Sequence, residues 1–215
     1  FVARELVVVD DGVESAEDLV PPDPRIRYLR VEPGQPLGAK LNLGMGAARA
    51  PLLQKLDDDD WYHPRFLETT VAAVRAAGRE AVAGFDSFLV LIAATGELKE
   101  SGPGWCAGGT LCFTREVWER TPFRPLPFEV DWWLLQDHGR EPVRIAGRSE
   151  RYVLVRHGHG HAWTRMGTVD VTGWFARQPD HPKPLADVLD DPADLDFYDS
   201  LRADGALAGA AASAP

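Results

Sequence analysis

The stretch Glu5-Leu-Val-Val-Val-Asp10-Asp11-Gly12 decides the fold class. A short apolar run that ends in acid and glycine is typical of a strand buried on both faces of a parallel sheet. An alternating strand at 25–31 and a helical pattern at 37–48 follow, and 52–56 returns to strand. This β-α-β order predicts an α/β protein with a mostly parallel, doubly wound sheet and helices on both faces.

The clearest helix is expected between Pro64 and Gly78, because Leu67, Val71 and Val74 share one helical face. Further strands are predicted at 81–85, 88–93, 110–113, 143–145 and 152–155, with helices after Thr114 and at 131–138. We assign residues 1–189 to one domain. Residues 190–215 turn acidic and then rich in alanine and glycine, so we interpret them as a tail.

Composition excludes several classes of function. The 215 residues are 45% hydrophobic, enough for a core, and their formal net charge of −10 with no basic cluster argues against a nucleic-acid partner. The apolar stretches are far shorter than the ~20 residues of a transmembrane helix. Cys106 and Cys112 fit neither a zinc knuckle nor a disulfide framework, which favours a reducing, cytoplasmic location.

Two groups of aspartates, Asp10-Asp11 and Asp57 to Asp60, fall at the carboxyl ends of predicted strands, where doubly wound sheets bind ligands. Four adjacent carboxylates repel one another unless solvent or a cation separates their charges. Magnesium and manganese prefer oxygen ligands, take one or two protein carboxylates, and complete their shell with water and phosphate oxygens. The run therefore predicts Mg²⁺ or Mn²⁺ bridging to a diphosphate.

Two other interpretations of the run were weighed. An acidic run is often a solvent-exposed loop. A calcium loop is the second alternative, because Asp57, Asp59 and Glu68 occupy its first, third and twelfth positions. Tyr62, however, stands where that loop requires glycine, which disfavours it.

Three motifs in order resemble the family-2 glycosyltransferases, which have the GT-A fold of nucleotide-diphospho-sugar transferases. They are the Val-Val-Val-Asp-Asp-Gly of 7–12, Gly38-Ala-Lys-Leu-Asn42-Leu-Gly44, and the Leu-Asp-Asp-Asp-Asp-Trp-Tyr-His-Pro of 56–64. The similarity continues through Gly108-Gly109, Glu129-Val-Asp131 and Tyr152-Val-Leu-Val-Arg-His157 to about Trp163. It implies a metal-assisted, inverting, hexosyltransferase-like enzyme that moves a sugar from a nucleotide-diphosphate donor, a UDP-sugar, to a saccharide or other hydroxyl acceptor.

The resemblance also implies roles for individual residues. The donor nucleotide would contact Asp10, Asp11, Lys40, Asn42, Asp57, Asp58 and Arg156. The cation would bind Asp59, the last carboxylate of the family's Asp-x-Asp motif, and His157, with Asp60 supporting them. Asp131 would take the proton from the acceptor hydroxyl, with Glu129 in reserve. The acceptor or sugar pocket would include Trp105, Gly108, Gly109 and Trp132.

Simpler roles remain open for several of these residues. Asp131 also suits the cap or first turn of a helix, and a tryptophan is more often a packing residue than a sugar platform. Alternation of His157, His159 and His161 on a strand would place three imidazoles on one face, as zinc requires. The intervening glycines disfavour a regular strand, and the resemblance favours His157 alone.

The sequence departs from the family in two places. The family has another strand and helix ahead of the strand at Glu5, so we expect that the sequence lacks an N-terminal stretch. Leu41 stands where many members have arginine, a charge that Lys40 or Arg156 would have to supply. One alternative is therefore a noncatalytic nucleotide- or sugar-binding relative. Another is a nucleotidyltransferase, although no glycine- and lysine-rich phosphate loop is seen near the start.

Overall fold

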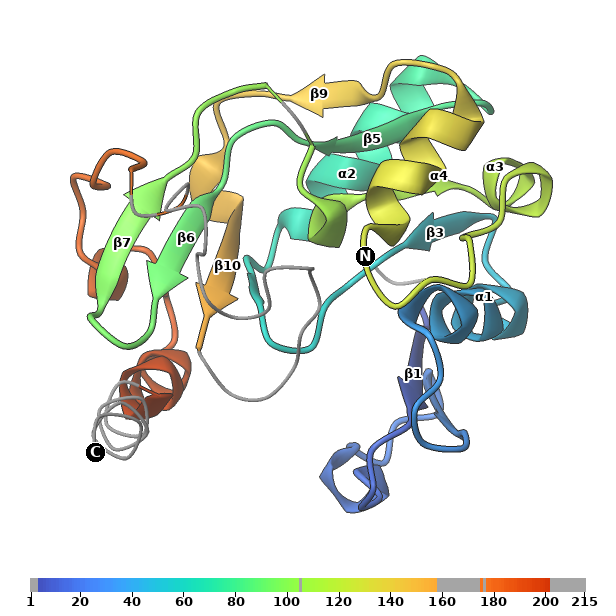
Figure 1. Ribbon diagram of the computed structural model, residues 1–215. Helices are drawn as coiled ribbons and strands as arrows, with labels where there is room; N and C mark the ends of the chain where they lie inside the picture. The colour runs from blue at the N-terminus through green and yellow to red at the C-terminus, as the bar shows by residue number, and fades with distance from the viewer. Residues whose placement is uncertain (1–3, 105, 158–174, 176, 202–215) are drawn as a thin grey trace, which may run out of the picture.

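The computed structural model describes residues 4–104, 106–157, 175 and 177–201. Within these ranges the chain is an α/β protein (Figure 1). Its strands and helices are β1 (Leu6–Asp10), β2 (Ile26–Arg30), α1 (Leu37–Ala47), β3 (Leu52–Gln54), β4 (Trp61–Tyr62), α2 (Phe66–Ala77), β5 (Val82–Phe85), β6 (Leu89–Ile92), β7 (Glu97–Glu100), β8 (Cys112–Thr114), α3 (Arg115–Arg120), α4 (Val130–His138), β9 (Val143–Ile145) and β10 (Tyr152–Arg156). The predicted α/β class is confirmed.

Among the described residues the strands form three small sheets, whereas a single, mostly parallel sheet was predicted. β1 pairs in parallel with β2, while the other two sheets have the orders β3-β8-β5-β9 and β4-β10-β6-β7. Only β5–β9 and β6–β10 are parallel in the larger sheets; β8 runs antiparallel to both β3 and β5. The β6–β7 pair is also antiparallel, because the short turn at Thr95-Gly96 reverses the chain at once.

The predicted elements are found in the expected order, with small shifts. α2 buries Phe66, Thr70 and Val74, so its buried stripe is centred one position before the predicted Leu67 and Val71, which are half-buried. The other elements were predicted within a few residues, except that the two-residue β4 and the hairpin strand β7 were not expected. α1 packs against β1 and also against the core of the sheet that contains β3 (Figure 1).

The acidic part of the predicted tail packs on the domain. Val188, Leu189 and Tyr198 are buried together with Trp61 of β4. The Trp61 indole Nε1 donates a hydrogen bond to the carboxylate of Asp194 at 2.8 Å. Of residues 190–201, which were assigned to the tail, Tyr198 and Leu201 thus pack against the core beside β4.

Two observations concern membrane-spanning segments and cysteine pairing. No helix among the described residues is long and apolar enough to cross a membrane. Cys106 and Cys112 are both buried, unpaired thiols.

Candidate functional site

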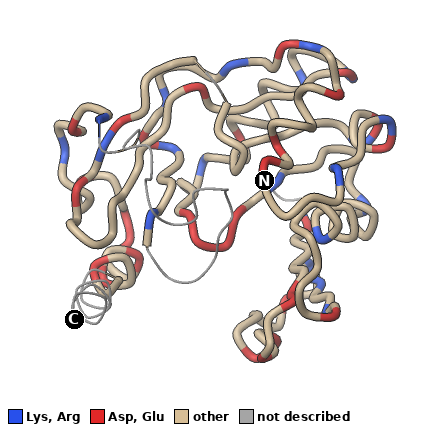
Figure 2. Tube along the Cα trace, viewed as in Figure 1, with Lys and Arg blue, Asp and Glu red and all other residues tan. Residues whose placement is uncertain are grey.

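An open cavity of about 2630 Å³ runs along β1 and β3 and past their carboxyl ends. It is bordered by β1, α1 and β3, by the turn at 108–109 and by the start of α4. The four aspartates of 57–60, which we call the acid run, also line it and form the loop between β3 and β4. Figure 2 shows this loop as a continuous acidic stretch between the two larger sheets.

The four carboxylates of the acid run have different surroundings. Asp57 accepts hydrogen bonds from the buried Lys55 ammonium through both of its oxygens, one of them at 2.6 Å, whereas Asp58 is exposed. Asp59 Oδ2 lies 3.2 Å from Nε2 of His157. Asp60 accepts from the Tyr152 hydroxyl and from the backbone N–H of Val155 at 2.9 Å.

Burial and mutual repulsion act on the two inner carboxyls of the acid run. Burial raises the pKa of Asp59 above its ordinary value, and the neighbouring Asp57 and Asp58 raise it further. The pKa of Asp60 is raised well above its usual range, again chiefly by burial and then by Asp57 and Asp59. Negative charge on Asp59 and Asp60 is thus disfavoured unless a positive charge compensates it, and a bound cation would lower both pKa values.

The turn at Gly108-Gly109 lies against the side chains of both Asp57 and Asp131. A Cβ atom on Gly108 would lie 2.3 Å from Oδ2 of Asp131, and one on Gly109 would lie 2.7 Å from Oδ2 of Asp57. Only residues without a side chain allow this close approach. Tyr62 connects the acid run to the glycine turn. Its hydroxyl accepts a hydrogen bond from the Asp57 backbone N–H at 2.7 Å and donates one to the Gly109 carbonyl at 3.2 Å.

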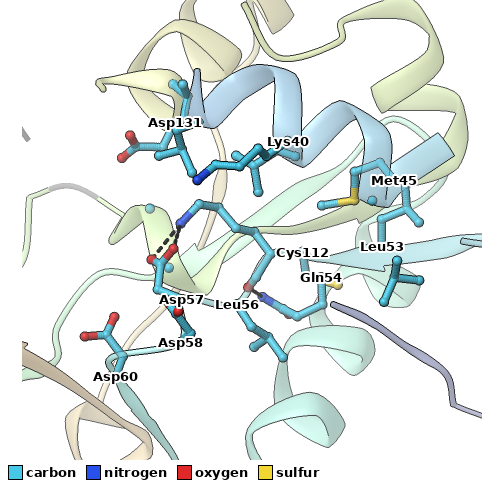
Figure 3. Close-up of a pocket in the computed structure, with 18 of the residues that line it drawn as sticks. Lys40, Met45, Leu53, Gln54, Leu56, Asp57, Asp58, Asp60, Cys112 and Asp131 are labelled. Carbon is cyan, nitrogen blue, oxygen red and sulfur yellow. Dashed lines mark hydrogen bonds and ion pairs between the residues drawn. The ribbon is translucent and has the colours of Figure 1, made fainter. Parts of the chain in front are cut away.

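Both candidate proton acceptors lie at the start of α4. Burial raises the pKa of the Asp131 carboxyl, while the Lys55 ammonium opposes that rise. Glu129 adopts a left-handed backbone conformation with φ of 58°, which is uncommon for a residue other than glycine. Figure 3 shows the side chains of Asp131, Lys40 and Asp57 directed toward the same part of the cavity.

The acceptor pocket was predicted around two tryptophans. Trp132 is 57% exposed and lines the cavity, so its ring is accessible to a ligand. The adjacent Trp133 is half-buried with the guanidinium of Arg124 stacked over its ring. Trp105 lies outside the described residues.

Asp10 and Asp11 line the cavity next to β1. The carboxylate of Asp10 accepts hydrogen bonds from the Tyr28 hydroxyl and from the backbone N–H groups of Gly12 and Ala16, and these bonds lower its pKa. Asp11 Oδ1 forms an ion pair with Nζ of Lys40 at 2.6 Å. The structure thus brings Lys40 to Asp11 at the edge of the cavity.

Two predicted donor residues lie elsewhere. The Asn42 side chain donates to the Phe123 carbonyl at 2.7 Å and accepts from the Trp118 indole and the Phe123 N–H, both at 3.0 Å. Asn42 therefore holds α1 to the segment around α3 and does not line the cavity. Arg156 is 4% exposed, stacks over Phe175 and is likewise absent from the cavity lining.

Sequence reasoning missed three residues at the centre of the site: Lys55, Tyr62 and Tyr152. One signal was available, because Lys55 is a charged residue between the predicted strand and the acid run, with leucines at 52, 53 and 56 around it. The two tyrosines gave no such signal, since their roles depend on contacts with Gly109 and Asp60 that are distant in sequence.

The side chains present fit a hard divalent cation in a limited way. The described residues contain no cluster of three or more histidine, cysteine, aspartate or glutamate side chains arranged to hold a metal ion. Asp59 and His157 do form an adjacent pair, and Mg²⁺ commonly takes only one or two protein ligands beside water and phosphate. The three-histidine zinc alternative rests on His159 and His161, which lie outside the described residues.

The fold and the cavity define the class of protein: an α/β domain in which the acid run lines a cavity. Residues 3–85 match the family model described as "Glycosyl transferase family 2". Over 82 residues the chain is 37% identical to the succinoglycan biosynthesis protein ExoO of Rhizobium meliloti (strain 1021). That alignment covers 37% of this chain and 24% of ExoO.

Among solved structures, the chain is similar to S. aureus TarS 1–349 in complex with UDP-GlcNAc, with a TM-score of 0.51 and 12% sequence identity. The similarity covers 73% of this chain and 51% of TarS, and at that identity it concerns the fold alone. Residues 3–85 thus resemble glycosyl transferase family 2, and the described domain shares the GT-A fold. The chain spans about a quarter of ExoO and about half of this TarS structure.

Proposed function

We propose that this protein is a glycosyltransferase that moves a sugar from a UDP-sugar, or another nucleotide-diphosphate sugar, to an acceptor hydroxyl with inversion of configuration. One observation carries the proposal: the turn at Gly108-Gly109 holds Asp57 of the acid run and Asp131 of α4 against its two sides. Carboxylates suited to the donor and a carboxylate suited to proton transfer therefore share one cavity. The family match and the UDP-GlcNAc bound by TarS support a uridine nucleotide donor.

In the proposed reaction Asp131 accepts the proton of the acceptor hydroxyl as the acceptor oxygen bonds to the anomeric carbon. The bond from that carbon to the diphosphate oxygen breaks, and its electron pair leaves on the nucleoside diphosphate. Mg²⁺ or Mn²⁺ held by Asp59 and His157 would supply positive charge beside the leaving diphosphate. Asp57 and Asp58 would orient the donor, and the exposed ring of Trp132 offers a flat apolar surface to a sugar.

The test is calorimetric titration of UDP into the full chain, with Mn²⁺ and with EDTA. Tight binding with Mn²⁺ only is expected, and Asp59→Ala should weaken it at least tenfold. Asp187→Ala is the matched control, because Asp187 is an exposed aspartate that does not line the cavity. Binding that ignores both Mn²⁺ and Asp59 would contradict the proposed donor site.

A second measurement separates an enzyme from a noncatalytic relative. UDP release from UDP-sugars is followed in the presence of a panel of hydroxyl acceptors, with wild-type protein and with Asp131→Asn. We expect wild-type turnover and a loss of 100-fold or more in the variant. UDP binding without any turnover would favour the noncatalytic alternative.

A further inference from the structure

Lys55 is a lysine buried within the acidic site. It follows β3, is only 4% exposed, and precedes the acid run by two residues. A buried ammonium is costly unless opposite charges compensate it. Its position thus requires a set of carboxylates around it.

Carboxylates from two parts of the fold face this ammonium. Lys55 contacts both oxygens of Asp57 directly. Burial alone lowers the pKa of Lys55, but the attraction of Asp57, Asp131 and Asp60 outweighs burial and leaves that pKa raised. Lys55 is therefore charged, and it acts on the acid run and on the start of α4 together.

The ion pair with Asp57 has a geometric consequence. Asp57 Oδ2 faces the Cα of Gly109, and the Asp57 backbone N–H is held by Tyr62. Lys55 thus holds the side chain of Asp57, and Tyr62 holds its main chain. Together they fix Asp57 against the Gly108-Gly109 turn.

The same ammonium also acts on Asp131. The charged groups that affect Asp131 most strongly are Lys55, from the end of β3, and Asp57, from the acid run, and the effect of Lys55 is the larger. Lys55 favours the carboxylate form of Asp131, whereas burial and Asp57 favour the protonated form. A proton acceptor must be deprotonated before the acceptor hydroxyl arrives.

We propose that Lys55 is a positioning residue of this site, whose ammonium fixes Asp57 against the Gly108-Gly109 turn and attracts Asp131, which lies against the other glycine of that turn. Its role in transfer rests on the proposed function; its action on Asp131 does not. The ammonium thus links the donor side of the cavity to the residue that receives the acceptor's proton.

The direct test follows Asp131 without any substrate. The carboxyl groups of ¹³C-labelled aspartates are titrated by NMR in the wild type, Lys55→Met and Lys55→Arg, and Asp131→Asn assigns the signal. We expect Asp131 to titrate at higher pH in Lys55→Met and near the wild-type value in Lys55→Arg. An unchanged titration of Asp131 in Lys55→Met would overturn the proposal.

A second variant covers the case in which Lys55→Met does not fold because Asp57 loses its partner. Lys55→Met/Asp57→Asn removes both charges of the pair and leaves no buried unpaired carboxylate at this position. Since Lys55 affects Asp131 more than Asp57 does, the Asp131 titration should still move to higher pH. A titration that stays at the wild-type value in the double variant would also overturn the proposal.

Kinetic measurements test the role of Lys55 in sugar transfer. Lys55→Met should lower kcat at least tenfold with less than a threefold change in the affinity for UDP and Mn²⁺, and Lys55→Arg should restore most of kcat. Lys99→Met is the matched control, because Lys99 is another buried lysine paired with an aspartate, Asp180, outside the cavity. Equal loss in Lys55→Met and Lys99→Met would overturn the positioning role. A wild type without turnover contradicts the proposed function alone, since the NMR titration still decides the action of Lys55 on Asp131.

Discussion

Asp10-Asp11 and the acid run both follow a strand and both border the cavity, but their charges are balanced differently. Asp10 receives hydrogen bonds from Tyr28 and two backbone N–H groups and lies 2.9 Å from Arg30, and Asp11 pairs with Lys40. The acid run has four carboxylates, with Lys55 and His157 as the basic side chains in contact with it among the described residues. The two groups therefore differ in their basic partners, and we propose the cation site at the acid run alone.

The largest expected effect comes from breaking the contact between the acid run and the glycine turn. In Gly109→Ala the new methyl group would lie 2.5 Å from the Tyr152 hydroxyl and 2.7 Å from Asp57, so the turn or the run must shift. A misplacement of about 1 Å commonly costs about 100-fold in rate, so transfer from a UDP-sugar should fall by about that factor.

Gly102→Ala is the control for that substitution, because a Cβ at Gly102 meets nothing within 4 Å. Its rate should equal that of the wild type. Equal rates in Gly109→Ala and the wild type would show that the contact between turn and acid run does not matter for transfer.

The second prediction compares the two acidic groups by their influence on how strongly Mn²⁺ stabilises the folded protein. Mn²⁺ at about 100 times its Kd should stabilise the folded protein by about 2.7 kcal/mol, which is roughly 5–10 °C in Tm for a domain of this size. Asp59→Asn should abolish the shift, whereas Asp10→Asn should keep it, because the chain's own donors already satisfy Asp10. Thermal unfolding with and without Mn²⁺ measures this; a shift lost in both variants would remove the distinction.

The smallest effect is a difference in the sign of the pH dependence. The pKa of Asp10 is lowered on folding, so its stabilisation is present above about pH 3.9 and is lost as pH falls through the folded pKa. The pKa of Asp131 is raised, so this residue lowers stability as pH rises from about 3.9 through its folded pKa. At neutral pH Asp10→Asn should therefore destabilise the protein and Asp131→Asn should stabilise it.

Urea unfolding of the metal-free protein between pH 3.5 and 8 checks both signs. The difference between the wild type and each variant should shrink toward the acid end of this range. Two variants that change stability in the same direction at pH 7 would show that the two carboxyls are not held in opposite ways.

The sequence predicted most elements because their patterns are local. The buried strand at β1 and the apolar face of α2 can be recognised from neighbouring residues alone. The sheet order could not be predicted in this way, since the antiparallel return of β8 between β3 and β5 depends on long-range pairing.

The candidate site shows the same division. Resemblance located the acid run, Asp131 and the two glycines by their motifs, but it did not give their partners. Asn42 was assigned to the donor because of its motif, whereas its contacts are with Phe123, 81 positions away. Lys55 was missed because its role depends on Asp131, which lies on a different part of the fold.

The hydrogen bond from Trp61 to Asp194 joins two residues that are 133 positions apart. During synthesis at about 5–20 residues per second, the acid run emerges roughly 7 to 27 s before Asp194 is added to the chain. Throughout that interval the loop next to Trp61 lacks this support. This contact beside the acid run is therefore made late in the biogenesis of the protein, whatever the order in which its earlier strands fold.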